Sequence, residues 1–68
     1  MKKILIYGAG GHCTSLISLI ESTNKYKIVG IIGKKEELNN KVLNYKIKYV
    51  DSDLKNLSKL FKNIAISI

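Results

Sequence analysis

The 68-residue sequence contains no proline, no tryptophan and no arginine, and it has one cysteine and one histidine. A lone cysteine cannot form an internal disulfide, and one histidine beside one cysteine does not supply the ligands of a zinc site. A domain of this size buries only about 60% of the surface that its unfolded chain exposes. Its stability must therefore come from one small hydrophobic core, without disulfide or metal.

Acidic residues are few: the chain has five of them and twelve lysines, which gives a net charge of +7. Such a balance can favour phosphate-bearing partners. The lysines are spread along the whole chain, however, and base recognition relies mainly on arginine, which is absent. We therefore expect solvated lysine faces and no nucleic-acid partner.

Long apolar runs are missing as well. The run over residues 4–7, which follows Lys2 and Lys3, ends at Gly8. It falls well short of the roughly 7–15 apolar residues of an export signal. No other stretch approaches the roughly 20 apolar residues that cross a bilayer. We expect a soluble, cytoplasmic protein with a reduced thiol at Cys13 and no membrane partner.

What the sequence does contain is an alternation of strand and helix patterns. Short apolar runs predict strands, the third of them weak, over residues 3–7, 27–32, 47–50 and 63–68. Helical spacing predicts two amphipathic helices, over about 11–23 and, after cap candidates at 51–53, over 54–61. A single helical turn is expected within 36–40, and residues 42–50 are expected to be extended.

This alternation predicts an α/β fold, a Rossmann-like three-layer βαβ fragment with two main helices. The expected sheet is short and parallel, with roughly three to four strands in the order 3-2-1-4. Residues 1–68 form a single domain in this interpretation. Because the sequence ends on an apolar strand, where doubly wound folds continue with a covering helix, we expect a truncated domain.

The glycine turn Gly8-Ala9-Gly10-Gly11-His12 lies between the first predicted strand and the first predicted helix. It approximates G-x-G-x-x-G, with Cys13 in place of the third glycine. Gly8 allows a tight turn, Gly10 lets backbone N–H groups approach a phosphate, and the helix directs its positive end at the anion. Anion binding is favoured over a turn that only joins strand to helix, because the motif stands in the right context.

The two side chains after the glycines each have two interpretations. His12 could bond a ligand phosphate or sugar, or it could bond the backbone at the helix start. Cys13 could be a reactive thiol at the helix end, but burial against the sheet is favoured.

The end of the second strand lacks the acid that bonds ribose hydroxyls in dinucleotide-binding domains. Gly33 stands there, followed by Lys34 and Lys35. NAD is therefore disfavoured. The two lysines could contact a ribose 2′-phosphate or a pyrophosphate, although a solvated loop is the commoner meaning of such a pair. A Walker site is excluded, because no Gly-Lys-Ser/Thr follows the glycines.

Residues 3–12, the helix that follows and residues 26–32 resemble the amino-terminal domain of bacterial sugar O- and N-acetyltransferases of the sialic-acid (NeuD/PglD) type. Residues 42–45 and 63–68 resemble its later segments, so the resemblance covers the whole chain. It implies a Rossmann-like domain that binds a UDP- or CMP-sugar at the glycine turn. Gly8, Gly10, Gly11 and His12 match that turn, and the substrate-binding residues we predict are Gly8, Ala9, Gly10, Gly11, His12, Gly33, Lys34 and Lys35.

In that family, acetyl-CoA and the catalytic histidine belong to a following left-handed β-helix, which trimerises. No residue of this chain matches that histidine, so we expect no catalytic residue, no cofactor, no metal and no acetyltransferase activity in this chain alone. The chain departs from the family at Gly33-Lys34-Lys35, where an Asp or an Asp-Asp pair is usual.

Two alternatives stay open. One is a NAD(P)- or CoA-binding regulatory domain in which Lys34 and Lys35 recognise a phosphate. The other is a ligand-free structural or oligomerisation fragment that associates with itself through an exposed sheet edge.

Overall fold

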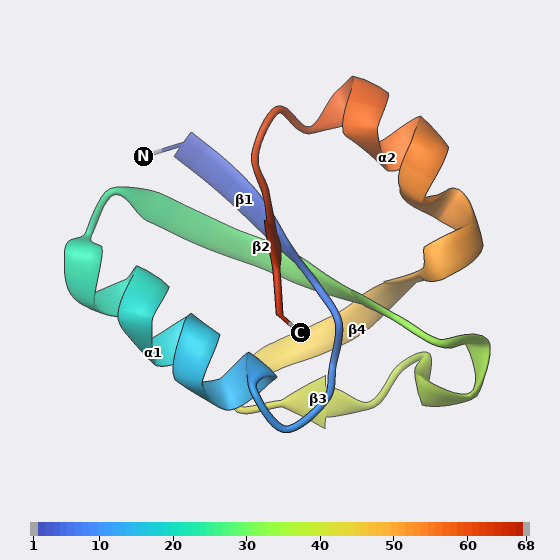
Figure 1. Cartoon of the computed structure of the whole chain (residues 1–68), viewed down its shortest axis with the longest axis horizontal. Coiled ribbons are helices and arrows are strands. Elements are labelled where there is room, and N and C mark those ends of the chain that lie inside the picture. Colours follow the sequence, from blue (N-terminus) through green and yellow to red (C-terminus); the bar gives the residue numbers. More distant parts are fainter. Residues whose placement is uncertain (1, 68) are drawn as a thin grey trace.

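A computed structural model describes residues 2–67 of the chain (Figure 1). Its elements follow the sequence as β1 (Lys2–Tyr7), α1 (Cys13–Thr23), β2 (Tyr26–Gly33), the 3-10 turn η1 (Lys35–Glu37), β3 (Lys41–Val42), β4 (Tyr45–Val50), the 3-10 turn η2 (Asp51–Asp53), α2 (Leu54–Leu60) and β5 (Ile64–Ile66). The α/β class predicted from the hydrophobic pattern is confirmed.

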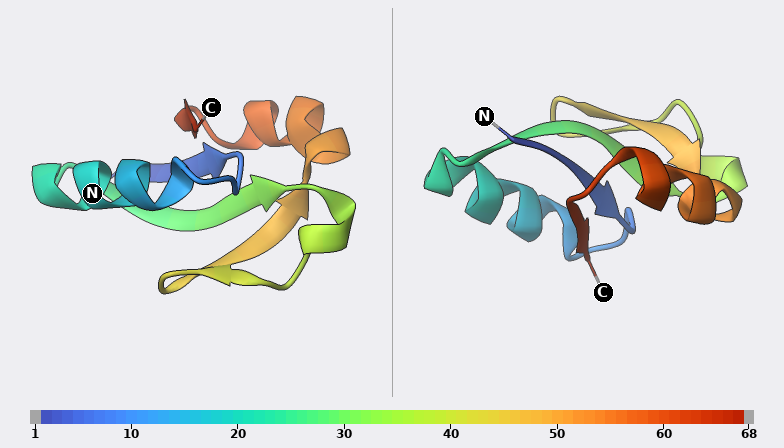
Figure 2. Two further views of the ribbon diagram at one scale, coloured as in Figure 1. Left: turned by 60° about the horizontal axis from the view of Figure 1, so that its bottom comes forward. Right: turned by 90° about the horizontal axis from the view of Figure 1, so that it is seen from above.

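The sheet has five strands in the order β3-β4-β2-β1-β5 (Figure 2). Strands β4, β2, β1 and β5 are parallel, and among themselves they keep the predicted order, with the first strand central. The predicted count of three to four parallel strands was too low, because the short strand β3 is added antiparallel to β4 and makes the sheet mixed.

The additional strand comes from a hairpin of β3 and β4 over residues 41–50, of which 42–50 were predicted to be extended throughout. Leu43 has a φ of 56°, which lets the chain fold back between β3 and β4. Two-residue hairpins need such left-handed residues, and their usual sequence signal is Asn-Gly or Asp-Gly. Leu43-Asn44 carries no such signal, so the sequence pattern did not predict the turn.

The helices cover opposite faces of the sheet, as the three-layer prediction requires (Figure 1). Ile4 and Ile6 of β1 pack in one core cluster with Ile17 of α1. Leu5, which lies between them, packs in a second cluster with Leu57 of α2. Because neighbouring residues of a strand point to opposite faces, β1 is covered on both sides. This explains why its sequence is continuously apolar.

Several element boundaries differ slightly from the predictions. Helix α1 begins at Cys13 rather than near residue 11, and the predicted turn within 36–40 is η1 at Lys35–Glu37. Phe61 follows α2 in an extended conformation with φ −119°, and it packs into the second core cluster. Strand β5 covers only part of the predicted segment 63–68, of which residue 68 lies outside the described residues.

Two leucine-sized positions on α1 test this assignment of the core. Ile17 is fully buried, whereas Leu19 is 63% exposed. Truncating Ile17 to alanine leaves a cavity, so we expect Ile17→Ala to cost about 2–5 kcal/mol of unfolding free energy. Leu19→Ala should change it by about 0.5 kcal/mol or less. Urea denaturation followed by circular dichroism measures both, and equal losses would contradict the packing of α1.

Candidate functional site

The glycine turn is held between two neighbouring segments of the sheet. The N–H of Gly8 donates to the carbonyl of Ile32 in β2 at 2.8 Å, and the N–H of Ser67 donates to the carbonyl of Tyr7 at 2.8 Å. The turn after β1 therefore lies between the carboxyl ends of β2 and β5. In α/β sheets, ligands bind in the crevice at such strand ends where the strand order reverses.

Gly8 is the glycine that the fold itself requires. Its φ is +105°, and a Cβ placed on it would lie 2.5 Å from the carbonyl oxygen of Ser67. No L side chain fits that position without moving the backbone.

Gly10 and Gly11 have a different environment. A Cβ on either residue would meet no atom within 4 Å, and neither residue has a positive φ. Within residues 2–67, no steric reason requires glycine at these two positions. The space in front of the helix is open to a ligand.

The first turn of α1 leaves backbone N–H groups available. The N–H of Cys13 donates to the carbonyl of Gly10 at 3.0 Å and that of Leu16 to the carbonyl of His12 at 3.1 Å, whereas the N–H groups of Thr14 and Ser15, between them, have no backbone acceptor among the described residues. The first turn has no acidic residue, and the side chain of His12 makes no capping bond. The structure thus contradicts the interpretation of His12 as a backbone-bonding residue. Free N–H groups and the helix dipole at a helix start are the features that suit an anion.

A pocket of about 430 Å³ opens beside the turn. It contains five of the eight predicted binding residues, namely Gly8, Ala9, Gly10, Gly33 and Lys34. Tyr7, Ile32, Glu37, Asp51, Ile66 and Ser67 complete its lining. The glycine turn and the end of β2 therefore meet in one pocket, as their positions in the sequence predict.

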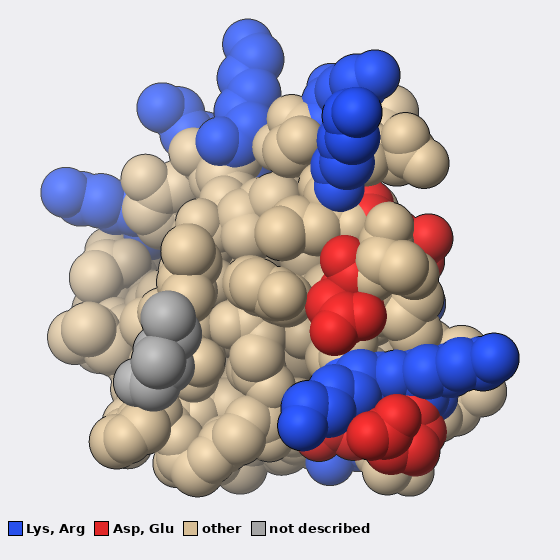
Figure 3. Space-filling view, turned by 45° about the vertical axis from the view of Figure 1, so that its right-hand side comes forward, with Lys and Arg blue, Asp and Glu red and all other residues tan. Residues whose placement is uncertain are grey.

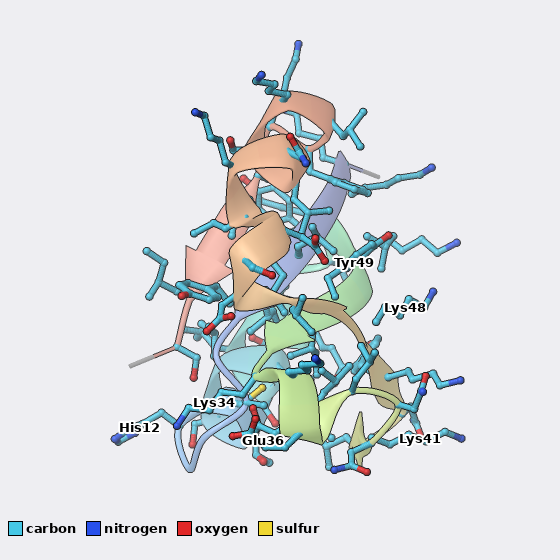
Figure 4. All side chains as sticks on the ribbon, turned by 90° about the vertical axis from the view of Figure 1, so that its right-hand side faces the viewer. His12, Lys34, Glu36, Lys41, Lys48 and Tyr49 are labelled. Carbon is cyan, nitrogen blue, oxygen red and sulfur yellow. The ribbon has the colours of Figure 1, made fainter. Side chains whose placement is uncertain are left out.

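The other three predicted residues do not line this pocket. The His12 side chain is exposed and points outward from the glycine loop, while Lys34 lies beside that loop (Figure 4). His12 borders a separate, shallow groove with Leu19 and Ile66. Gly11 lies in the turn itself and Lys35 is exposed in η1. A ligand role for these three residues stays a prediction.

Two acidic residues of the pocket were not among the predicted site residues. Glu37 folds back from η1, so that its Oε1 accepts a hydrogen bond from the N–H of Lys34 at 2.7 Å. The same oxygen lies 3.0 Å from the place where a Cβ of Gly33 would be. Asp51 follows β4 directly and reaches the same pocket. Acidic side chains gather in two groups on the face seen in Figure 3.

Neither acid stands directly at the end of the second strand, where the motif places a ribose-bonding acid; Glu37 follows Gly33 by four residues, in η1. From the sequence, Asp51 is a helix-cap candidate too distant to be placed beside His12. In the fold, the carboxyl ends of neighbouring parallel strands meet at one edge of the sheet, which brings Asp51 to the pocket. An acid directly after a strand is the one signal in the sequence that points to Asp51.

Cys13 is buried in the core cluster that β1 and α1 share, which confirms the prediction of a packed thiol. Burial raises the pKa of the Cys13 thiol above its ordinary value of 9.0, and the negative charge of Glu37 raises it further. The alternative of a reactive, activated thiol is therefore wrong.

Thiol chemistry tests this environment. We expect native protein to react with an aromatic disulfide reagent far more slowly than urea-unfolded protein. Because the pKa of Cys13 is higher in the folded than in the unfolded state, its contribution to stability is complete below pH 9.0 and is lost as the pH rises beyond it. Cys13→Ala should make the alkaline loss of stability less steep. Equal native and unfolded rates would refute the burial.

The glycines make a second test possible. Gly8→Ala places a side chain at positive φ against Ser67, so we expect a loss of about 1–3 kcal/mol or more. Gly10→Ala should preserve the fold or stabilise it by up to about 1 kcal/mol, because alanine restricts the unfolded chain. Thermal denaturation of both variants checks the expectation, and a similar loss in each would contradict the geometry.

Comparisons with known proteins complete the description of the site. A family model described as the PglD N-terminal domain matches residues 3–68. No curated protein and no solved structure was found to match the chain. None of the helices within residues 2–67 is long and apolar enough to cross a membrane. The match covers the glycine turn and every strand, with only Lys2 at the start of β1 outside it. The chain therefore belongs to the PglD N-terminal domain family.

Proposed function

We propose that this chain is the nucleotide-sugar-binding module of a bacterial, cytoplasmic sugar O- or N-acetyltransferase of sialic-acid or amino-sugar biosynthesis. The observation that carries the proposal is the composition of the pocket. The pocket brings together the open glycine turn before α1 and two carboxylates, those of Glu37 and Asp51. Family membership supports the acetyltransferase context.

The glycine turn accommodates the phosphates. Gly10 and Gly11 present backbone without a Cβ, and the first turn of α1 offers N–H groups. Lys34 brings a positive charge to the same pocket. A pyrophosphate is bound well by this combination of helix end, N–H donors and one cation.

The two carboxylates of the pocket accommodate hydroxyl groups. Glu37 and Asp51 are hydrogen-bond acceptors, and a ribose or a sugar ring has hydroxyls to donate. A further phosphate placed against them would be repelled. This arrangement favours a UDP- or CMP-sugar over NADPH or CoA, each of which carries an additional phosphate on its ribose.

NAD is the second candidate, and Glu37 is the observation that favours it. The chain was expected to lack the acid that recognises an NAD ribose, but the Glu37 carboxylate lies at the end of β2 after all. A nucleotide-sugar is preferred because the chain belongs to the PglD N-terminal domain family. Catalysis, acetyl-CoA and trimer formation belong, in this proposal, to a β-helix outside residues 1–68.

Direct titration tests the choice of ligand. The isotope-labelled chain is titrated with a UDP-sugar, a CMP-sugar, NAD, NADPH and CoA, and amide shifts are followed by NMR. We expect a UDP- or CMP-sugar to shift the amides of the glycine turn and of the segment from Gly33 to Glu37. Binding of NAD alone would overturn the proposal in favour of the regulatory alternative.

Two variants locate the ligand groups. Gly10→Ala leaves the fold intact but should weaken every phosphate-bearing ligand. Glu37→Gln keeps an oxygen acceptor for the Lys34 N–H but loses the charge, so we expect affinity for the sugar nucleotide to fall about 10–100-fold. Glu36→Gln is the matched control, because Glu36 is exposed and does not line the pocket. Equal effects of the two glutamate variants would argue against the hydroxyl site.

A further inference from the structure

Lysines from four strands lie on one face of the sheet. Lys3 of β1 is the register partner of Lys27 of β2. Lys41 of β3 is likewise the partner of Lys46 of β4, and Lys48 follows two residues later on β4. Register partners point to the same face of a sheet, as do alternate residues of a strand. All five side chains are exposed, and together they form what we call the lysine face.

The core clusters identify which face this is. Ile4 and Ile28, which directly follow the first pair of lysines, pack in the cluster that includes α1. Val42 and Tyr45, which lie between the second pair, pack against the same cluster. Because neighbouring residues of a strand point to opposite faces, the lysines lie on the α2 side of the sheet. Their exposure shows that α2 leaves this part of the sheet uncovered.

Gly30 in the middle of β2 makes room for one of these side chains. A Cβ on Gly30 would lie 3.3 Å from the Cδ of Lys48 and 3.6 Å from the side chain of Leu5, which belongs to the α2 side. The stem of Lys48 therefore passes over β2 on the lysine face. Lys41 and Lys48 project on the side of the molecule opposite His12, so the lysine face is separate from the glycine turn (Figure 4).

The positive charge of this face has no acidic counterpart on its strands. Strands β1, β2, β3 and β4 contain no acidic residue. Four of the five acidic residues of the chain lie in η1 and η2, at the carboxyl ends of β2 and β4. The fifth, Glu21, lies on α1 and accepts a hydrogen bond from the hydroxyl of Tyr45. A concentrated charge of one sign attracts partners of the opposite sign, so the lysine face suits an anionic surface.

The composition of the lysine face favours a bilayer over a nucleic acid. Its cations extend over four neighbouring strands, and such a two-dimensional array matches a plane of anionic headgroups. The chain has no arginine, the residue that reads bases best. Leu43 is 53% exposed at the tip of the hairpin that carries Lys41 and Lys46. A bilayer has an apolar boundary below its headgroups for such a side chain, whereas a phosphate backbone has none.

We propose that the lysine face docks this chain on a bilayer surface that contains anionic phospholipids. The ammonium groups lie against the headgroup phosphates, and Leu43 inserts at the margin of the contact. A lysine near such a surface strengthens binding about fivefold, so several lysines together hold the chain there. The expectation of no membrane partner rested on the lack of a spanning segment, which surface docking does not need. This proposal does not depend on the proposed ligand.

Cosedimentation with phosphatidylcholine vesicles, with and without phosphatidylglycerol, tests the docking. We expect the 68-residue chain to bind only the vesicles that contain phosphatidylglycerol, and to dissociate as the salt concentration rises. The double variant Lys46→Gln, Lys48→Gln should weaken binding about tenfold or more. Lys35→Gln, Lys55→Gln is the matched control, because it removes the same charge from exposed positions outside the lysine face and should weaken binding far less.

Three results of this experiment overturn the proposal. They are a wild type that does not bind the charged vesicles, equal effects of the two double variants, and tighter binding to a DNA or RNA duplex than to the vesicles at the same salt concentration.

Two further measurements test the orientation of the chain. Leu43→Asn suits the left-handed backbone at this position but removes the apolar side chain, so it should weaken vesicle binding several-fold without loss of stability. In NMR spectra of the isotope-labelled chain on nanodiscs with a paramagnetic lipid, the amides of β3 and β4 should broaden more than those of the glycine turn. Unchanged binding of the variant, or broadening that is strongest at the glycine turn, contradicts the proposed docking.

Discussion

The close approach of three backbone segments at Gly8 underlies both the fold and the site. The N–H of Gly8 donates a hydrogen bond to β2, and the carbonyl of the preceding Tyr7 accepts one from the N–H of Ser67. The Ser67 carbonyl oxygen occupies the space where a side chain of residue 8 would lie. Any other residue would separate β1 from the segment after β5. The turn, the start of α1 and the floor of the pocket would move with it.

The fold was largely predictable because its signals are local. Continuous apolar runs indicate strands covered on both faces, and helical spacing of Leu and Ile indicates α1 and α2. The β3–β4 hairpin was not predictable in this way, because it depends on a left-handed Leu43, a residue type that rarely adopts this conformation. Packing of the hairpin against the sheet, rather than local preference, stabilises that turn.

The candidate site was predicted only in part. The glycines could be recognised because they stand at fixed places in a known motif, and the steric requirement at Gly8 agrees with its place there. Glu37 and Asp51 could not be placed, because their positions depend on the direction of a short 3-10 turn and on which strands are neighbours. Such information lies in the tertiary structure, where residues distant in sequence meet at one sheet edge.

The bond between Glu37 and the Lys34 N–H has a thermodynamic consequence. A free glutamate side chain loses rotational entropy when it orders around a ligand, and this loss reduces affinity. Here the ordering takes place when the chain folds, because the carboxylate is already held over the end of β2. The pocket is thus preorganised at the Glu37 carboxylate, and this preorganisation depends on the integrity of a turn of three residues.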